Sequence, residues 1–336
     1  LDANTTANDN TAVGSSALTA NTTGAQNVAV GNDTLAANTT GSLNVAMGHI
    51  ALDANTTGTE NVAIGTYALS SSTTAGTNTA IGHYALYDNT DGTKNVGVGW
   101  RAAYQQTTPS HNTAVGYQAL QGTTTGGENT AIGAFAMQQN TTAADNTAVG
   151  KSALQLNTTG SLNTAIGRSA LAATTTGVQN TALGYGAGGA NTTGQYSVFI
   201  GKDAGAANTS GTEHTFVGYL AGRYTTGSGI DYNTGIGSRA LYANSSGEQN
   251  VGVGAYALAA NTTATQNVGI GYNALGGNTT GATNIAVGAY ALDANTTASN
   301  NTAIGGNALT TSTTGAGNSA VGNGAGDNVT TGSNNS

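Results

Sequence analysis

A unit of 17 residues repeats from one end of the chain to the other, and this period constrains the fold more than any other feature. The unit reads, on average, Asn-Thr-Ala-Ile-Gly-x-x-Ala-Leu-x-x-Asn-Thr-Thr-Gly-x-x. Its first position is occupied by Asn10, Asn27, Asn44, Asn61, Asn78, Asn95, Asn112, Asn129, Asn146, Asn163, Asn180, Ser197 and His214 and, after an insertion of two residues, by Asn233, Asn250, Asn267, Asn284, Asn301 and Asn318. A short fixed period is typical of a solenoid, in which each turn buries its apolar residues only against neighbouring turns.

The residue types within one unit favour strands over helices. Position 5 is Gly in all 19 units and position 4 is always aliphatic, while Thr and Gly are frequent elsewhere and disfavour helix. We expect a strand at positions 1–4, a bend at the Gly, a second short strand near positions 6–10 and a turn at Asn-Thr-Thr-Gly. The sequence therefore predicts an all-β fold, a parallel β-solenoid (β-roll) of about 19 turns.

Two positions of the unit change together. Position 9 is usually Leu, but it is Gly188, Gly205 and Gly222 in three consecutive turns. Position 3 is usually Ala, but it is Phe199 and Phe216 in two of those turns. Because a close-packed interior must keep its volume, we expect positions 3 and 9 to share one buried space.

The aliphatic residue at position 4 predicts an oligomer. Residues alternate between the two faces of a strand, so position 4 points away from the space that position 3 occupies. A narrow solenoid has only one interior, and an apolar stripe on its outside would promote association. We expect partner chains to cover this stripe, most simply in a bundle of three.

Composition indicates one continuous segment of a longer fibre, residues 1–336, with no domain boundary. The net charge is −8, from 7 basic and 15 acidic residues, and no run of Lys or Arg predicts nucleic-acid binding. The chain has no Cys, no signal peptide and no hydrophobic stretch long enough to insert into a membrane. It begins and ends within a unit, which we interpret as the mark of a segment.

The repeat resembles the head repeats of trimeric autotransporter adhesins of the YadA-like type, and the related repeats of phage-type tail fibres. The resemblance rests on Ser197-Val198-Phe199-Ile200-Gly201, on Asn318-Ser319-Ala320-Val321-Gly322, and on the stretch from Asn267 to Leu275 with its Asn278-Thr279-Thr280-Gly281 turn. It implies a left-handed roll, three chains wound side by side, and an extracellular role at a cell or virion surface. The function implied is the shaft or head of an adhesive fibre that binds a surface receptor, with a glycan among the candidate receptors, without catalysis.

Irregular turns near residues 100–111 and 223–232 are the places where we expect receptor contacts, because loops that interrupt a rigid repeat often carry recognition. Exposed Tyr and Trp suit contacts with sugars or proteins, although packing over the bend would also explain them. The candidate contact residues are Trp100, Arg101, Tyr104, Tyr117, Arg223, Tyr224 and Tyr232.

No catalytic or metal-binding pattern emerges, so we predict neither an enzyme nor a cofactor. The four His residues have no acidic partner that repeats in phase, and no Ser-His-Asp pattern is evident. The Gly-Gly-x-Gly-x-Asp repeat of calcium-binding rolls is missing. A carbohydrate-active enzyme would need an acidic cluster on one face, which the scattered Asp and Glu do not predict.

The Asn-Thr-Thr turns allow two further readings. They create Asn-x-Ser/Thr glycosylation acceptors, but a turn in which Asn stacks on Asn in a ladder would explain the same pattern, as would a hydrogen-bonded ladder for the first Asn of each unit. Repeated Thr also suggests an ice-binding solenoid, our alternative function. Adjacent Thr residues at a corner point to opposite sides, however, whereas a flat array needs Thr at alternate positions.

Overall fold

The structure, a computed structural model, describes residues 2–226 and 231–336. It divides into two compact units, Leu1–Asn163 (unit 1) and Thr164–Ser336 (unit 2). Each is a parallel β-solenoid in which one turn corresponds to one 17-residue repeat, and the described residues contain no helix. The predicted fold class is confirmed.

Each turn contributes one short strand at positions 2–4. In unit 1 the strands are β1 (Thr11–Val13), β2 (Val28–Val30), β3 (Val45–Met47), β4 (Val62–Ile64), β5 (Thr79–Ile81), β6 (Val96–Val98), β7 (Thr113–Val115), β8 (Thr130–Ile132) and β9 (Thr147–Val149). In unit 2 they are β10 (Thr164–Ile166), β11 (Thr181–Leu183), β12 (Val198–Ile200), β13 (Thr215–Val217), β14 (Thr234–Ile236), β15 (Val251–Val253), β16 (Val268–Ile270), β17 (Ile285–Val287), β18 (Thr302–Ile304) and β19 (Ser319–Val321).

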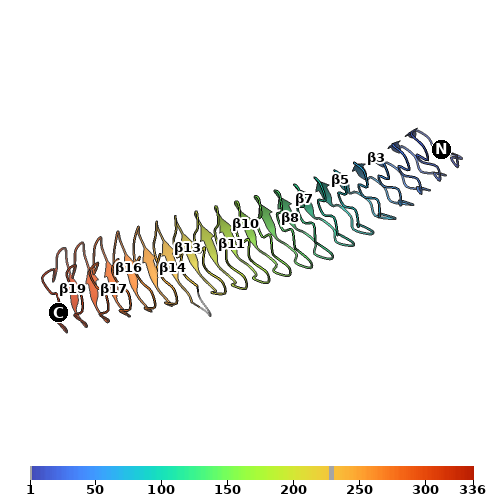
Figure 1. Cartoon of the computed structure of the whole chain (residues 1–336). Helices are drawn as coiled ribbons and strands as arrows, with labels where there is room; N and C mark the ends of the chain where they lie inside the picture. Colours follow the sequence, from blue (N-terminus) through green and yellow to red (C-terminus); the bar gives the residue numbers. More distant parts are fainter. Residues whose placement is uncertain (1, 227–230) are drawn as a thin grey trace. The chain divides into compact units, whose positions relative to one another are not determined.

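Within each unit, every strand pairs in parallel with the next one in sequence, so equivalent positions stack. Ala29 pairs with Ala46 in unit 1, and in unit 2 the pairing of Phe216 with Gly235 shows how the two-residue insertion is absorbed outside the sheet. The labelled strands of each unit follow one another along one side of the coil (Figure 1). Position 3 therefore forms a buried row, while positions 2 and 4 form the outer face of the sheet.

The expected second strand near positions 6–10 was wrong, because these positions form a turn. Positions 7 and 9 adopt a left-handed backbone conformation, as at Asp33 (φ 54°) and Leu35 (φ 52°), which a strand cannot contain. The turns still bond to each other here, since the Leu35 N–H donates to the Ala51 carbonyl at 3.1 Å and the Ala37 N–H to the Asp53 carbonyl at 3.0 Å. Hydrogen bonding between turns thus continues beyond the sheet.

The Gly at position 5 is required both by its backbone angle and by its neighbours. Gly48 has φ +131°, and a Cβ atom added to it would lie 2.7 Å from the carbonyl carbon and oxygen of Gly65 in the next turn. Real Cβ atoms do not approach backbone so closely. The expectation of a positive φ or of close contact between turns is confirmed, because both apply.

The apolar half of the interior consists of positions 3, 8 and 9, and it shows the predicted exchange of volume. A Cβ on Gly97, at position 3, would lie 3.0 Å from the Leu86 side chain at position 9 of the preceding turn. Where position 9 is Gly, Phe fills the gap: a Cβ on Gly205 would lie 2.3 Å from the ring of Phe199. Phe199 is fully buried.

The polar half of the interior consists of two Asn ladders, at positions 1 and 12. Asn27 Nδ2 donates to the Gly41 carbonyl at 2.8 Å, and its Oδ1 accepts the Asn44 N–H at 3.0 Å. Asn38 Nδ2 donates to the same Gly41 carbonyl at 2.9 Å and to Asn21 Oδ1 at 2.8 Å. The predicted ladders are confirmed, and they saturate polar groups that would be costly to bury unpaired.

Candidate functional site

The outer strand face carries an uncharged apolar stripe along each unit. Position 4 is aliphatic in every turn and points outward, with Met47 46% exposed in unit 1 and Leu183 45% exposed in unit 2. Position 2, Thr or Val in most turns, flanks it and is half-buried in most turns. The outward orientation predicted for position 4 is confirmed.

Four predicted contact residues of unit 1 lie together at the corner formed by positions 6–10. The Arg101 guanidinium lies 4.5 Å from the ring centroid of Trp100 and 5.0 Å from that of Tyr104. Trp100 stacks on Tyr117 with centroids 4.8 Å apart. Arg101 Nε is buried without a hydrogen-bond partner among the described residues. Attraction between the cation and the ring faces replaces hydrogen bonds in holding this side chain.

The aromatic cluster extends beyond the predicted residues. Tyr84 stacks on Tyr67 at 5.1 Å, and Tyr87 stacks on Tyr104 at 5.3 Å. Burial, followed by the neighbouring phenol of Tyr104, raises the pKa of Tyr87. We call Tyr67, Tyr84, Tyr87, Trp100, Arg101, Tyr104 and Tyr117 the aromatic corner. Tyr87 was missed although Tyr104, which occupies the same position 10 one turn later, was among the predicted residues.

A shallow hollow of about 420 Å³ adjoins this corner in unit 1. It is lined by Gln105, Gln121, Gly122, Gln138, Gln139, Thr141 and Thr158. Gln138 Nε2 donates to Gln121 Oε1 at 3.3 Å, and Gln155 Nε2 donates to Gln138 Oε1 at 3.1 Å. The hollow therefore offers neutral amide and hydroxyl groups.

The second predicted patch, in unit 2, is only partly assembled. The Arg223 guanidinium lies 5.3 Å from the Tyr224 ring centroid, and Tyr224 meets Tyr242 edge to face at 5.0 Å. A side-chain hydrogen bond with Tyr242 raises the pKa of Tyr224. Tyr232 is exposed and has no ring contact with another described residue. Residues 227–230 of this predicted irregular turn lie outside the described residues.

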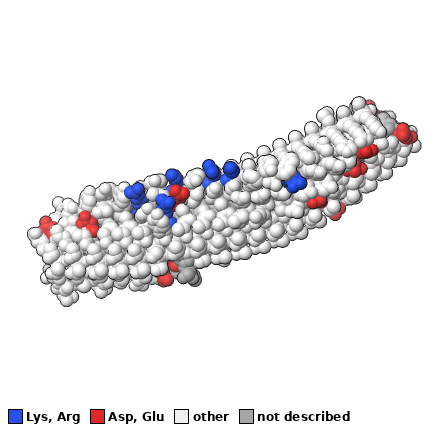
Figure 2. All heavy atoms as spheres, in the orientation of Figure 1, with Lys and Arg blue, Asp and Glu red and all other residues white. Residues whose placement is uncertain are grey.

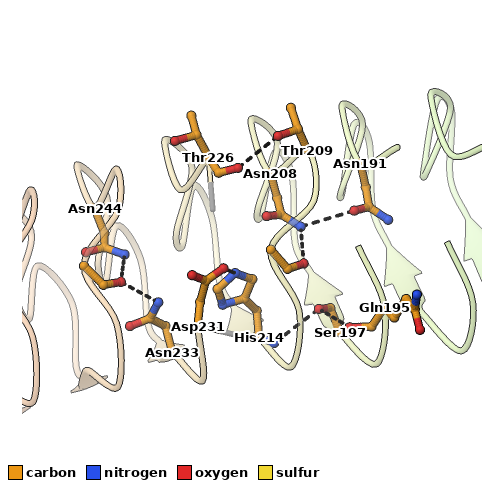
Figure 3. A network of polar contacts seen from close by, with 12 residues as sticks. Asn191, Gln195, Ser197, Asn208, Thr209, His214, Thr226, Asp231, Asn233 and Asn244 are labelled. Atoms are coloured by element: carbon orange, nitrogen blue, oxygen red, sulfur yellow. Dashed lines mark hydrogen bonds and ion pairs between the residues drawn. The ribbon is translucent and has the colours of Figure 1, made fainter. Parts of the chain in front are cut away.

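The inserted turn of unit 2 holds a buried His–Asp pair, in which His214 replaces the ladder Asn at position 1 (Figure 3). His214 Nε2 lies 3.3 Å from Asp231 Oδ2, and both side chains are buried. A Cβ on Gly211 would lie 2.4–2.6 Å from the Asp231, His214 and Asn208 side chains, so only Gly leaves room for them. The residue in phase with His214 is Asn233, because the insertion lengthens this turn to 19 residues, so Asp231 is out of phase with His214 and the 17-residue period could not have predicted the pair.

The neighbouring Ser197 hydroxyl bonds to backbone groups. Its Oγ accepts the His214 backbone N–H at 3.2 Å and donates to the Gln195 carbonyl at 3.1 Å. The Ser197 hydroxyl thus takes the place of an Asn side-chain oxygen in the position-1 ladder. Among the described residues, no group of three or more His, Cys, Asp or Glu side chains could hold a metal ion.

The corner Asn and the first Thr of each corner pair are occupied by the fold itself. The acceptor asparagines Asn21, Asn38, Asn157, Asn191, Asn261 and Asn278 are completely buried. The first Thr of the pair is also engaged, as where Thr39 Oγ1 donates to the Thr56 carbonyl at 3.0 Å. In the folded chain these amides are inaccessible to glycosylation. The second Thr of each pair stays exposed, as at Thr57, Thr74 and Thr108, so a row of hydroxyl groups lies on the surface at position 14.

No family model and no curated protein matches this sequence. The resemblance to YadA-like heads therefore rests on the repeat motif alone. In the described residues, no helix is long and apolar enough to cross a membrane.

Proposed function

We propose that this chain forms the shaft or head of an extracellular adhesive fibre at a cell or virion surface, as a left-handed homotrimer and without catalysis. The observation that carries the proposal is the outward stripe at position 4, aliphatic in all 19 units. Exposed apolar surface that continues from turn to turn is typical of a surface that another molecule covers.

Two further copies of the same chain are the occupants that suit this stripe best. No residue at position 2 or 4 is charged, so identical faces can meet without repulsion. All copies share the 17-residue period, so one favourable contact between chains recurs in every turn. The left hand and the number three come from the resemblance to YadA-like heads.

The aromatic corner of unit 1 and the Arg223–Tyr224 patch of unit 2 supply candidate receptor contacts outside the stripe. They combine aromatic rings with guanidinium groups, which are frequent in energetically important contacts. The neutral hollow beside the aromatic corner would add hydrogen bonds to a hydroxyl-rich ligand such as a glycan.

The first test is the molar mass of the chain in solution by light scattering on a sizing column. We expect about three times the chain mass of 32.7 kDa. A monomer would overturn the proposed fibre.

Matched variants locate the contact. Ile64→Lys, Ile81→Lys and Val98→Lys together place three charges on the stripe and should dissociate the assembly, because buried unpaired charges are costly. Thr57→Lys, Thr74→Lys and Thr108→Lys add the same charge at exposed corner positions, and should leave the mass unchanged. Loss of assembly in both sets would contradict an interface at position 4.

An ice-binding solenoid is the second candidate, favoured by Thr at position 2 of the strand face. Thr113, Thr130 and Thr147 follow one another in adjacent turns, about 4.8 Å apart as neighbouring strands are. They alternate with aliphatic residues on one flat face, unlike the corner Thr pairs. A monomer that produces thermal hysteresis, reduced by Thr130→Lys, would favour this function over the fibre.

A further inference from the structure

The basic residues of unit 2 gather at one corner of the solenoid. They are Arg168, Lys202, Arg223 and Arg239, and each occupies position 6, 7 or 10 of its turn. Figure 2 shows Lys and Arg atoms concentrated along one edge of a mostly uncharged surface. The sequence contains no run of Lys or Arg, but residues one or two periods apart become neighbours once the chain is coiled. We infer that this corner binds a linear acidic polysaccharide.

Cations and tyrosines alternate strictly along the corner, one per turn. Six residues in successive turns form what we call the cation–tyrosine ridge: Arg168, Tyr185, Lys202, Tyr219, Arg239 and Tyr256. Tyr185 lies between two cations, with its ring centroid 5.8 Å from the Arg168 guanidinium and 5.9 Å from Lys202 Nζ. Lys202 Nζ is also 5.9 Å from the Tyr219 ring. Cation–ring contacts thus join Arg168 through Tyr219 in one row, and a separate contact of 5.6 Å joins Arg239 to the Tyr256 ring.

The ridge is accessible and carries a local positive charge in a chain whose net charge is −8. Tyr185 is 50% exposed and Tyr219 is 46% exposed. The one ion pair between described residues joins His214 and Asp231, so no described carboxylate pairs with a ridge cation. Asp203, next to Lys202 in sequence, is the one acidic residue at this corner within the six turns.

Charge spacing selects the class of polymer. Successive ridge cations are two turns apart, or roughly 10 Å at about 4.8 Å per turn. Duplex DNA carries a charge about every 1.7 Å, too dense for a few widely spaced cations on an acidic protein. A polysaccharide with one carboxylate or sulfate per disaccharide has sparse charges, and its sugar rings can pack against the intervening tyrosines.

The inference rests on the proposed adhesive function, whose receptor class it names, but not on the trimer. The ridge lies at positions 6 and 7, whereas the stripe proposed to join the chains lies at position 4. Oligomeric state and polymer binding therefore can be measured and can fail independently.

The test measures binding of the full chain to immobilised hyaluronan, chondroitin sulfate and duplex DNA by biolayer interferometry. We expect binding to at least one of the two polysaccharides, weakening as salt concentration rises. The combined variant Arg168→Gln, Lys202→Gln and Arg239→Gln should weaken this binding at least tenfold. Light scattering should give the same molar mass as the parent chain.

Two single variants that each remove one positive charge distinguish the loss of a ridge contact from a change in net charge. Lys202→Gln should weaken binding several-fold, whereas Lys94→Gln, at position 17 in unit 1, should leave it unchanged. Binding to DNA alone would replace the inference with nucleic-acid recognition. Absence of binding to either polysaccharide, or equal loss in the two single variants, would overturn it while leaving the fibre proposal intact.

Discussion

The interior of each turn has an apolar half, built by positions 3, 8 and 9, and a polar half, built by the asparagines at positions 1 and 12. The two halves differ where the sequence departs from its repeat. In the apolar half, the space above Gly188 and Gly205 is filled by the ring of Phe199. In the polar half, Ser72 replaces a ladder Asn and nothing compensates, so that Asn55 Oδ1 is buried without a partner.

The same loss recurs wherever the position-12 ladder is interrupted. The Oδ1 atoms of Asn55, Asn89, Asn157, Asn208 and Asn295 have no hydrogen-bond partner among the described residues, and each precedes a turn with another residue at position 12. The Ala75 carbonyl beside Ser72 still accepts Asn61 Nδ2 at 2.9 Å. Because Asn side chains of both ladders donate to the same carbonyl, that carbonyl keeps one partner when one ladder is interrupted. In the apolar half, a missing ring would instead leave a void.

The largest expected effect is in the apolar half. Phe199→Ala should lower the free energy of local opening in the surrounding turns of unit 2 by about 3–5 kcal/mol, because it removes a fully buried ring and leaves a cavity. Hydrogen exchange of the amides in residues 180–222 measures this. Phe135→Ala, at a half-buried corner position of unit 1, is the control and should cost much less.

Restoring the usual residues should recover part of that loss. Gly188→Leu and Gly205→Leu, added to Phe199→Ala, recreate the Leu–Ala arrangement of the other turns. Gly188 already has φ +58°, close to the φ +48° to +55° that buried Leu at position 9 adopts elsewhere. If the triple variant were no more stable than Phe199→Ala, positions 3 and 9 would not exchange volume as proposed.

The next effect concerns the rung where the buried pair of His214 and Asp231 replaces a ladder Asn. His214→Asn should destabilise the inserted turn by about 3 kcal/mol, because it leaves the buried Asp231 carboxylate without its partner. Combining it with Asp231→Asn removes the charge and should recover most of the loss. Hydrogen exchange near residues 208–216 reports both, and equal destabilisation by the single and double variants would contradict a paired role.

Much of this interior was predictable from the 17-residue period, because a periodic chain places equivalent residues in contact. The Asn ladders and the exchange between Phe199 and Gly205 followed from that rule alone. The turn at positions 6–10 did not, because residue types say little about left-handed backbone at Leu35. The structure shows that side chains at positions 6, 7 and 10 are neighbours, as in the contacts of Arg101 with Trp100 and Tyr104.

Two features of the candidate sites escaped prediction. The pair of His214 and Asp231 depends on the insertion, which places Asp231 out of phase with His214, whereas Lys202 lies two periods after Arg168 and could have been predicted from the period. Charged residues were considered where they are close together in the sequence. A solenoid instead brings together residues that lie whole periods apart. The contacts of Arg101 with Tyr84 and Tyr104 depend on side-chain rotamers, which no spacing predicts.

Repairing a break in the polar half should have a smaller effect of opposite sign. Ser72→Asn would supply an Nδ2 donor to the buried Asn55 Oδ1 and should raise the stability of the adjoining turns by about 1 kcal/mol. Thr57→Asn introduces the same residue at an exposed position and should change little. Destabilisation by Ser72→Asn would mean that the interior at this rung is too tight for the amide.

The smallest effect lies at the edge of the interior, where burial raises the pKa of the Asp53 carboxyl above 3.8 and outweighs the backbone hydrogen bonds that lower it. The folded chain then binds this proton more tightly than the unfolded chain does. This contribution to stability is therefore greatest below the unfolded pKa and declines as pH rises toward the folded pKa. Asp53→Asn should remove the decline and stabilise unit 1 at neutral pH by less than about 1 kcal/mol, since the group is half-exposed and screened by solvent. Denaturation profiles between pH 3 and 7 test this, with exposed Asp145→Asn as the control. A pH profile unchanged by Asp53→Asn would contradict the prediction, because it would show that burial of Asp53 at the edge of the interior does not affect the stability of the fold.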